Sequence, residues 1–262
     1  LDYMISIVVP LFNEEESLNT FYDELAKEIQ KLDEDYGIIF IDDGSTDNSL
    51  SVLKDLEDKN KKIRVFSFRK NQGKSEALTL GFQKAKGDYI ITLDADLQDS
   101  PSEIYRLFTK VKEGYDLVCG WRKERKDPLK KILASKFFNY LVGRLWGLKL
   151  HDYNCGLKAY TKDAAKSLNL YGGMHRFIPL IVHQQGFLVT EVLVTHERRK
   201  YGKSKYGFSK IVKDLPDMFT VFFLTRYSNR PLHFFGLMGT ILLMTGIVIL
   251  GYLSILRLEG EA

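Results

Sequence analysis

The sequence predicts an α/β protein with a mainly parallel sheet, because short apolar runs alternate with segments of helical spacing along its first hundred residues. A polar or charged turn directly follows each apolar run. The 262-residue chain also contains a long uncharged apolar segment near its end, after a stretch rich in Lys and Arg. These observations predict right-handed crossovers, helices on both faces of the sheet, and a C-terminal part associated with a membrane.

The elements alternate in a regular order. Strands are expected at 5–11, 38–41, 63–68 and 89–93, and the helices between them at 13–32, around 50–56, and at 75–85. Ser45 or Thr46 can cap the second helix, and Asp47 and Asn48 are also read as capping residues.

Polar segments stand where the predicted strands end. They are residues 10–14, 42–44, 69–74 and 94–98. Ligands of open parallel sheets bind beyond the carboxyl ends of the strands, so these four segments are expected to form one site.

The last of these segments has the composition of a site for a hard cation. Asp94, Asp96 and Gln98 alternate along the chain directly after an apolar run, and alternate side chains of an extended chain share a face. Oxygen ligands suit Mg²⁺ or Mn²⁺, and such an ion usually completes its shell with substrate phosphates. A nucleotide diphosphate is therefore expected here, with a solvated acidic turn as the alternative.

Several other motifs are absent. An EF-hand that starts at Asp94 would need a glycine at its sixth position, which is Asp99. A P-loop that ends at 73–75 would need a glycine at position 68, which is Phe68. The two cysteines, Cys119 and Cys155, lie far apart without metal-ligand spacing, so neither a disulfide framework nor a zinc site is expected, and a reducing compartment fits best.

Residues 234–256 contain no charged side chain, and this 23-residue length is enough for a transmembrane helix. Residues 198–230 carry nine Lys or Arg against two Asp, so the positive-inside rule predicts that the preceding domain faces the cytoplasm. Residues 128–148 and 211–224 have amphipathic patterns. The second is interpreted as an interfacial helix, and the first as a helix either on the sheet or on the bilayer.

Five segments carry a family resemblance: 8–15, 42–45, 94–99, 154–158 and 202–206. Together they resemble the family 2 glycosyltransferases of the polyprenyl-phosphate type, which include dolichyl-phosphate mannose synthase and bactoprenol glucosyltransferases. The likeness extends over residues 4–230. It implies a GT-A fold, a nucleotide-sugar donor, a divalent metal, a polyprenyl-phosphate acceptor and inversion at the anomeric carbon.

The resemblance also implies roles for individual residues. The nucleotide-sugar site would consist of Pro10, Phe12, Glu14, Asp42, Lys74 and Asp94, with Phe12 where relatives often have tyrosine. The metal ligands would be Asp94, Asp96 and Gln98, and the catalytic residues Asp96, Arg122 and Asp152. The lipid-phosphate site would consist of Arg122, Lys131, Ser135, Arg198, Arg199, Lys203 and Lys205.

Asp152 is the usual candidate for a catalytic base in this family. A lipid monophosphate is already mostly ionised at neutral pH, because its second pKa is about 6. Asp152 would then orient a sugar hydroxyl or a basic residue. The residues at 201–206 are expected either to close over the substrates or to attract anionic lipid.

The expected organisation is a cytoplasmic catalytic domain at 1–208, an interfacial helix at 209–232 and a transmembrane helix at 233–257 in a cell or endomembrane membrane. Relatives often carry further membrane helices, so the tail at 258–262 is expected to be cut short. UDP-glucose is the preferred donor, with GDP-mannose as an alternative. A non-catalytic nucleotide-sugar-binding membrane protein is a further alternative. Self-association is left open, and no nucleic-acid partner is expected.

Overall fold

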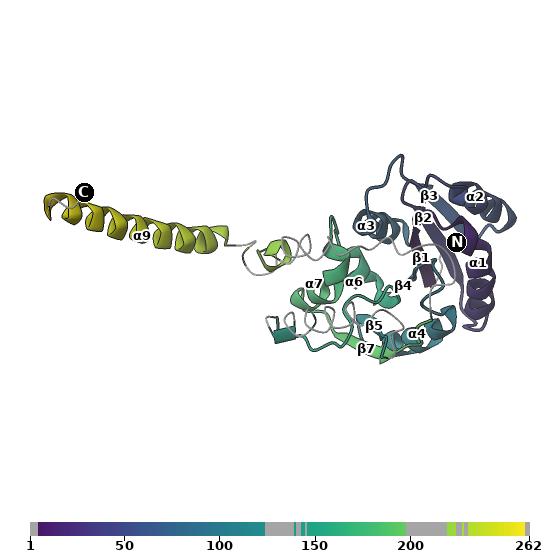
Figure 1. The fold of residues 1–262 in the computed structure, drawn as a ribbon. Helices are drawn as coiled ribbons and strands as arrows, with labels where there is room; N and C mark the ends of the chain where they lie inside the picture. Colours follow the sequence, from purple (N-terminus) through teal and green to yellow (C-terminus); the bar gives the residue numbers. More distant parts are fainter. Residues whose placement is uncertain are drawn as a thin grey trace. The chain divides into compact units, whose positions relative to one another are not determined.

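Among the described residues of this computed structural model, seven strands form one sheet in the order β3-β2-β1-β4-β6-β5-β7 (Figure 1). The described residues are 5–123, 139, 143–144, 146–197, 219–223, 227 and 230–259. The strands are β1 Ile5–Leu11, β2 Tyr36–Asp42, β3 Ile63–Ser67, β4 Tyr89–Thr92, β5 Leu117–Trp121, β6 Lys158–Thr161 and β7 Val189–Leu193.

The first four strands are parallel to one another, as the alternation of elements predicts. β1 pairs with β2 and β4, and β2 pairs with β3. β6 departs from this pattern because it lies antiparallel between β4 and β5, whereas β5 and β7 are parallel. The sheet is therefore mostly parallel, with one inverted strand beside its centre.

Helices cover both faces of the sheet. The helical elements are α1 Glu15–Gln30, α2 Ser49–Lys59, α3 Lys74–Lys84, η1 Pro101–Glu103, α4 Ile104–Lys112, α6 Lys162–Lys166, η2 Met174–Phe177 and α7 Ile178–Gln184. Alternate residues of β1 face opposite layers: Ile7 joins the core under α1, α2 and α4, and Val8 packs against α3. A Cβ at Gly81 of α3 would lie 2.3 Å from Cγ1 of Val8, so the absent side chain lets α3 approach the sheet.

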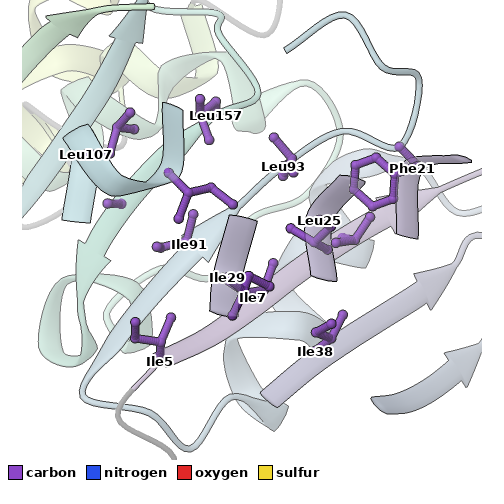
Figure 2. Close-up of a cluster of buried hydrophobic side chains, with 14 of the residues drawn as sticks. Ile5, Ile7, Phe21, Leu25, Ile29, Ile38, Ile91, Leu93, Leu107 and Leu157 are labelled. Atoms are coloured by element: carbon purple, nitrogen blue, oxygen red, sulfur yellow. The ribbon is translucent and has the colours of Figure 1, made fainter. Parts of the chain in front are cut away.

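The main hydrophobic core lies between the sheet and the layer of α1, α2 and α4. Figure 2 shows Ile5 and Ile7 of β1 among Leu25 and Ile29 of α1, with Ile91 of β4 nearby. These side chains are fully buried. Burial of apolar side chains is the dominant favourable term in folding, at about 25 cal/mol per Å² of apolar surface.

The predicted element bounds are close to the observed ones. The first strand begins and ends where the apolar run predicts, and β2 is longer than the expected 38–41 because Tyr36 and Gly37 also pair with β1. The third helix starts one residue early, at Lys74. Most of the amphipathic segments at 128–148 and 211–224 lies outside the described residues.

The chain divides into two compact units, Leu1–Asp214 and Leu215–Ala262. The second unit contains α9, Pro231–Glu259, whose residues 231–258 have a mean hydropathy of 2.2 and are not buried in the structure. α9 is, within the described ranges, the one helix that is long and apolar enough to cross a membrane. The aromatic rings of Phe223 and Tyr227 both pack on Phe234, near the start of this helix.

Candidate functional site

Loops that follow β1, β2, β3 and β4 are joined to one another by hydrogen bonds at the carboxyl edge of the sheet. Asn13 after β1 contacts the β2 loop, where its backbone N donates to Ser45 Oγ at 2.9 Å and its Oδ1 accepts from Thr46 N at 2.7 Å. Asn13 has a φ of 52°, a left-handed conformation that asparagine tolerates better than most residues. The first two loops are thus held side by side.

Asp43 joins the second loop to the third. Its Oδ1 accepts from Gln72 N at 2.7 Å, and its Oδ2 accepts from Gly73 N at 2.9 Å. Burial raises the pKa of Asp43, although these two hydrogen bonds act to lower it. Gly44 is required beside it, because its φ is +69° and a Cβ would lie 2.5 Å from the carbonyl carbon of Lys70.

The third and fourth loops meet through charge. Lys74, the first residue of α3, places Nζ 2.6 and 2.7 Å from the two carboxylate oxygens of Asp94. The side chains are 26% and 31% exposed, so solvent reaches this ion pair. Lys74 therefore neutralises Asp94 at a place that a ligand can also reach.

Asp94, Asp96 and Gln98 alternate with more deeply buried residues in the segment after β4. All three are half-buried, whereas the alternate residues Ala95 and Leu97 are buried. The backbone turns here instead of remaining extended, since Leu97 has a φ of 57° and Gln98 N donates to Asp96 Oδ1 at 3.1 Å. Exposed and buried side chains alternate as predicted, but the backbone forms a turn and is not extended.

The oxygen donors of this turn fit a hard divalent cation. Two carboxylates and an amide match the ligand preference of Mg²⁺ or Mn²⁺. The carboxylate of Asp94 packs closely on Gly156, because a Cβ at this position would lie 2.4 Å from Oδ2 of Asp94. Among the residues described, no group of three or more His, Cys, Asp or Glu side chains has an arrangement that could hold a metal ion, so a cation here would need other ligands as well.

The predicted nucleotide residues on β1 and β2 lie at the same edge of the sheet. Pro10 is buried near the end of β1, and Phe12 and Glu14 follow it half-buried. Asp42 is 1% exposed, and its carboxylate accepts from Ser45 N at 3.0 Å and from Ser67 Oγ at 2.6 Å. Asp42 thus connects the loop after β2 to the end of β3.

A second group of charges lies beyond β5. Arg122 directly follows this strand and makes a two-point contact with Asp152, with Nε 2.7 Å from Oδ2 and Nη2 3.0 Å from Oδ1. The two side chains are 10% and 3% exposed. Burial opposes the charge of Arg122, but nearby Cys155, Asp152 and Asp99 raise its pKa well above the usual value.

Asp152 is also held by the backbone, because Asn154 N donates to its Oδ1 at 3.1 Å. Its neighbour His151 stacks on Trp121 with the ring centroids 3.9 Å apart and contacts Glu191 through Nδ1. The two-point contact with Asp152 holds the guanidinium of Arg122 in one orientation.

The sequence interpretation missed the buried residues that connect these two groups of charges. Asp99 is 3% exposed and contacts His196 and Cys155, with Oδ1 3.3 Å from His196 Nδ1 and Oδ2 3.6 Å from Cys155 Sγ. Burial alone would raise the pKa of Asp99, but His196, Arg122 and Cys155 lower it to about 2. The only signal in the sequence was its position directly after Gln98.

Six of the predicted lipid-phosphate residues lie outside the described residues. They are Lys131, Ser135, Arg198, Arg199, Lys203 and Lys205. Of that predicted group, Arg122 alone is described.

The family model described as "Glycosyl transferase family 2" matches residues 6–168. The chain is 39% identical over 255 residues to a dodecaprenyl-phosphate galacturonate synthase of Rhizobium johnstonii, covering 95% of this chain and 75% of that protein. It is 34% identical over 257 residues to an undecaprenyl-phosphate 4-deoxy-4-formamido-L-arabinose transferase of Proteus mirabilis, covering 97% and 77%.

Two similar solved structures are more distant in sequence. Glucosyl-3-phosphoglycerate synthase from Mycobacterium tuberculosis, in complex with Mn²⁺ and UDP-glucose, matches with a TM-score of 0.63 and 18% identity over 85% of this chain and 79% of that one. A mannosyltransferase from Pyrobaculum calidifontis, in complex with GDP-Man and Mn²⁺, matches with a TM-score of 0.56 and 16% identity over 77% and 59%. At these identities the likeness concerns the fold.

Proposed function

The chain belongs to glycosyl transferase family 2 and has the GT-A fold, and we propose that it moves a sugar from a nucleotide-sugar donor to a membrane polyprenyl phosphate. The observation that carries this proposal is that two sets of charged side chains lie beyond the ends of two strands of one sheet. Asp94 and Asp96 stand at the end of β4, and Arg122 and Asp152 follow β5. The names of the two relatives above support the acceptor class.

The donor diphosphate binds on the side of Asp94, Asp96 and Gln98. A divalent cation held there would neutralise charge that develops on the departing nucleoside diphosphate. Lys74, which already lies within 2.7 Å of Asp94, exchanges that contact for the donor phosphates. The residues 10–14 and Asp42 form the nucleoside end, where the ring of Phe12 provides a stacking surface.

The acceptor phosphate binds on the side of Arg122. Asp152 holds the guanidinium of Arg122 by two contacts, so its orientation is set before the lipid arrives. The attacking phosphate oxygen is already ionised at neutral pH, with a second pKa of about 6, and needs no base to remove a proton. Asp152 acts in this proposal by orienting Arg122 and not by removing a proton.

The second unit anchors the enzyme in the bilayer. The 29 residues of α9 exceed the ~20 that a bilayer requires. The basic excess over 198–230 supports a catalytic domain on the cytoplasmic side. Residues 209–232 would lie in the interface, and 233–257 would cross the membrane.

Several sugar nucleotides are candidate donors. UDP-glucose is kept as the first candidate because a fold neighbour holds it, and GDP-mannose as the second for the same reason. The two named relatives act with galacturonate and 4-deoxy-4-formamido-L-arabinose, so UDP sugars of these types also belong in the test.

The experiment is transfer of radiolabel from each of these donors to a polyprenyl phosphate in detergent, with Mg²⁺, with Mn²⁺ and with EDTA. Metal-dependent label in the organic phase from one donor is expected and would identify the sugar. Folded protein that binds Mn²⁺ and UDP but labels no lipid from any donor would contradict the proposal and favour a non-catalytic binding protein.

A further inference from the structure

Glu191 on β7 holds the backbone of the loop that contains Asp152. His151 N donates to Glu191 Oε2 at 2.8 Å, and Asp152 N donates to the same oxygen at 3.4 Å. The other oxygen, Oε1, contacts Nδ1 of His151. One carboxylate thus accepts from two consecutive backbone N–H groups and also contacts an imidazole nitrogen.

The position of Glu191 in the sheet explains how it reaches this loop. Glu191 lies opposite Cys119 in the parallel pairing of β5 and β7, and alternate residues of a strand share a face. Trp121 is therefore on the same face as Glu191, and the ring of His151 stacks on it with an interplanar angle of 12°. Arg122 is the next residue after Trp121. The sheet thus places Glu191 beside the end of β5, where Arg122 begins the acceptor side of the proposed site.

The contacts of Glu191 are made where little solvent reaches. The side chain of Glu191 is 12% exposed, and those of Arg122 and Asp152 are 10% and 3% exposed. Hydrogen bonds to an ionised carboxylate are about twice as strong as those between neutral groups, and losing a partner is costly in a buried place. A weaker hold by Glu191 would therefore let the backbone of Asp152 move, and its carboxylate with it.

We propose that Glu191 is a positioning residue, which fixes the backbone of Asp152 so that the Asp152 carboxylate holds the guanidinium of Arg122 in the orientation that the acceptor phosphomonoester requires. The inference rests on the proposed function and deepens the acceptor side of that site. Glu191 acts through Asp152 and contacts no reacting atom. The contacts that carry the effect run without a break from Glu191 through Asp152 to Arg122.

The test compares three variants of the full chain. Glu191→Gln keeps the volume of the side chain but replaces one acceptor oxygen by a donor NH₂ group. His151→Ala removes the ring and its Nδ1 contact but keeps the backbone N–H groups that donate to Glu191. Glu57→Gln is the matched control, because Glu57 Oε1 also accepts from a backbone N–H, that of Val65 at 3.0 Å, and belongs to neither charged group of the site.

Each variant is assayed for kcat/KM with polyprenyl phosphate and for the Kd of Mn²⁺-UDP. For Glu191→Gln we expect kcat/KM to fall about tenfold, the effect of weakening a charge-assisted hydrogen bond. The Kd of Mn²⁺-UDP should change less than about twofold, because separate sites are nearly independent. His151→Ala should lower kcat/KM less than about threefold, since the backbone contacts remain. Glu57→Gln should match wild type in both values.

A double variant tests whether Glu191 acts through Asp152. Residues of one hydrogen-bonded network have non-additive effects. Added to Asp152→Asn, Glu191→Gln should lower kcat/KM by less than about twofold more, because the group that transmits its effect is already altered. A further loss of about tenfold in the double variant would give Glu191 a separate role and would contradict the inference.

Glu191→Asp takes the place of Glu191→Gln if that variant does not fold. It keeps both acceptor oxygens but sets them back by one methylene group. It should lower kcat/KM about threefold or more, again without a change in the Kd of Mn²⁺-UDP.

Two other results would overturn the inference. A kcat/KM equal to that of wild type in the Glu191 variant would remove the positioning role alone. A parallel loss of lipid labelling and of Mn²⁺-UDP affinity would show a general structural role. Failure of the wild-type protein to label lipid would instead remove the proposed function, and the inference with it.

Discussion

The two charged groups of the site differ in how their charges are held. Lys74 and Asp94 on the proposed donor side are about a quarter to a third exposed, whereas Arg122 and Asp152 on the proposed acceptor side are almost fully buried. An exposed ion pair contributes little stability, so its members can change partners at small cost. A buried pair cannot be broken without leaving a charge in the interior. The donor side is thus arranged for exchange with a ligand, and the acceptor side for a fixed geometry.

The largest expected effect comes from removing the exchangeable carboxylate. Asp94→Ala should weaken binding of Mn²⁺-UDP at least about 100-fold, because a ligand of the proposed cation is lost. The free energy of unfolding should change little, since the pair with Lys74 is solvent-accessible. Calorimetry and a thermal melt measure the two quantities, and a large drop in Tm would count against an exchangeable donor side.

The opposite pattern is expected on the acceptor side. Asp152→Asn removes the charge of the carboxylate that contacts the buried Arg122 at two points, so the free energy of unfolding should fall by about 3 kcal/mol. The Kd of Mn²⁺-UDP should stay close to wild type. Chemical denaturation in detergent measures the loss, and a melting curve unchanged from wild type would show that the pair is not fixed as described.

A smaller change is expected at Gly156, which packs on the carboxylate of Asp94. Gly156→Ala adds a Cβ 2.4 Å from the carboxylate oxygen, so Asp94 must shift, and Mn²⁺-UDP affinity should fall about tenfold. Gly236→Ala is the control, because a Cβ there meets no atom within 4 Å. If both variants bound Mn²⁺-UDP as tightly as wild type, the position of the Asp94 carboxylate would not matter for binding.

The smallest effect concerns pH and the buried acceptor side. Burial raises the pKa of the Cys119 thiol to about 12. Its unfolded pKa is about 8.5, so the folded thiol keeps its proton where the unfolded one loses it, and stability falls as pH rises above that value. In Cys119→Ser the free energy of unfolding should fall less steeply with rising pH, and the difference in slope should be about 1.4 kcal/mol per pH unit between pH 9 and 10. If the free energy of unfolding fell with pH at the same rate in both proteins, the pKa of the Cys119 thiol would not be raised in the folded state.

The donor side was largely predictable from the sequence because its signals are local. Apolar runs locate β1 to β4, and the polar residues stand directly after each run, so parallel topology alone gathers Asp42, Lys74 and Asp94. Gly156 was not found in this way. Its approach to Asp94 joins residues 62 positions apart, and neither periodicity nor turn composition contains that information.

The acceptor side was only partly predictable for the same physical reason. The resemblance identified Arg122 and Asp152, but their two-point contact depends on β6, the antiparallel strand that a regular alternation of strands and helices does not predict. Asp99 and His196 are 97 residues apart and pair inside the protein. Single-residue patterns cannot distinguish such a pair from an acidic turn and a lone histidine.

The most direct test of this contrast is the initial rate of lipid labelling by Asp94→Ala and Asp152→Asn, measured side by side with wild type at a temperature where all three are folded. The account predicts that Asp94→Ala has no detectable turnover, whereas Asp152→Asn keeps a measurable fraction because no base is required. Equal and complete loss in both variants would contradict it.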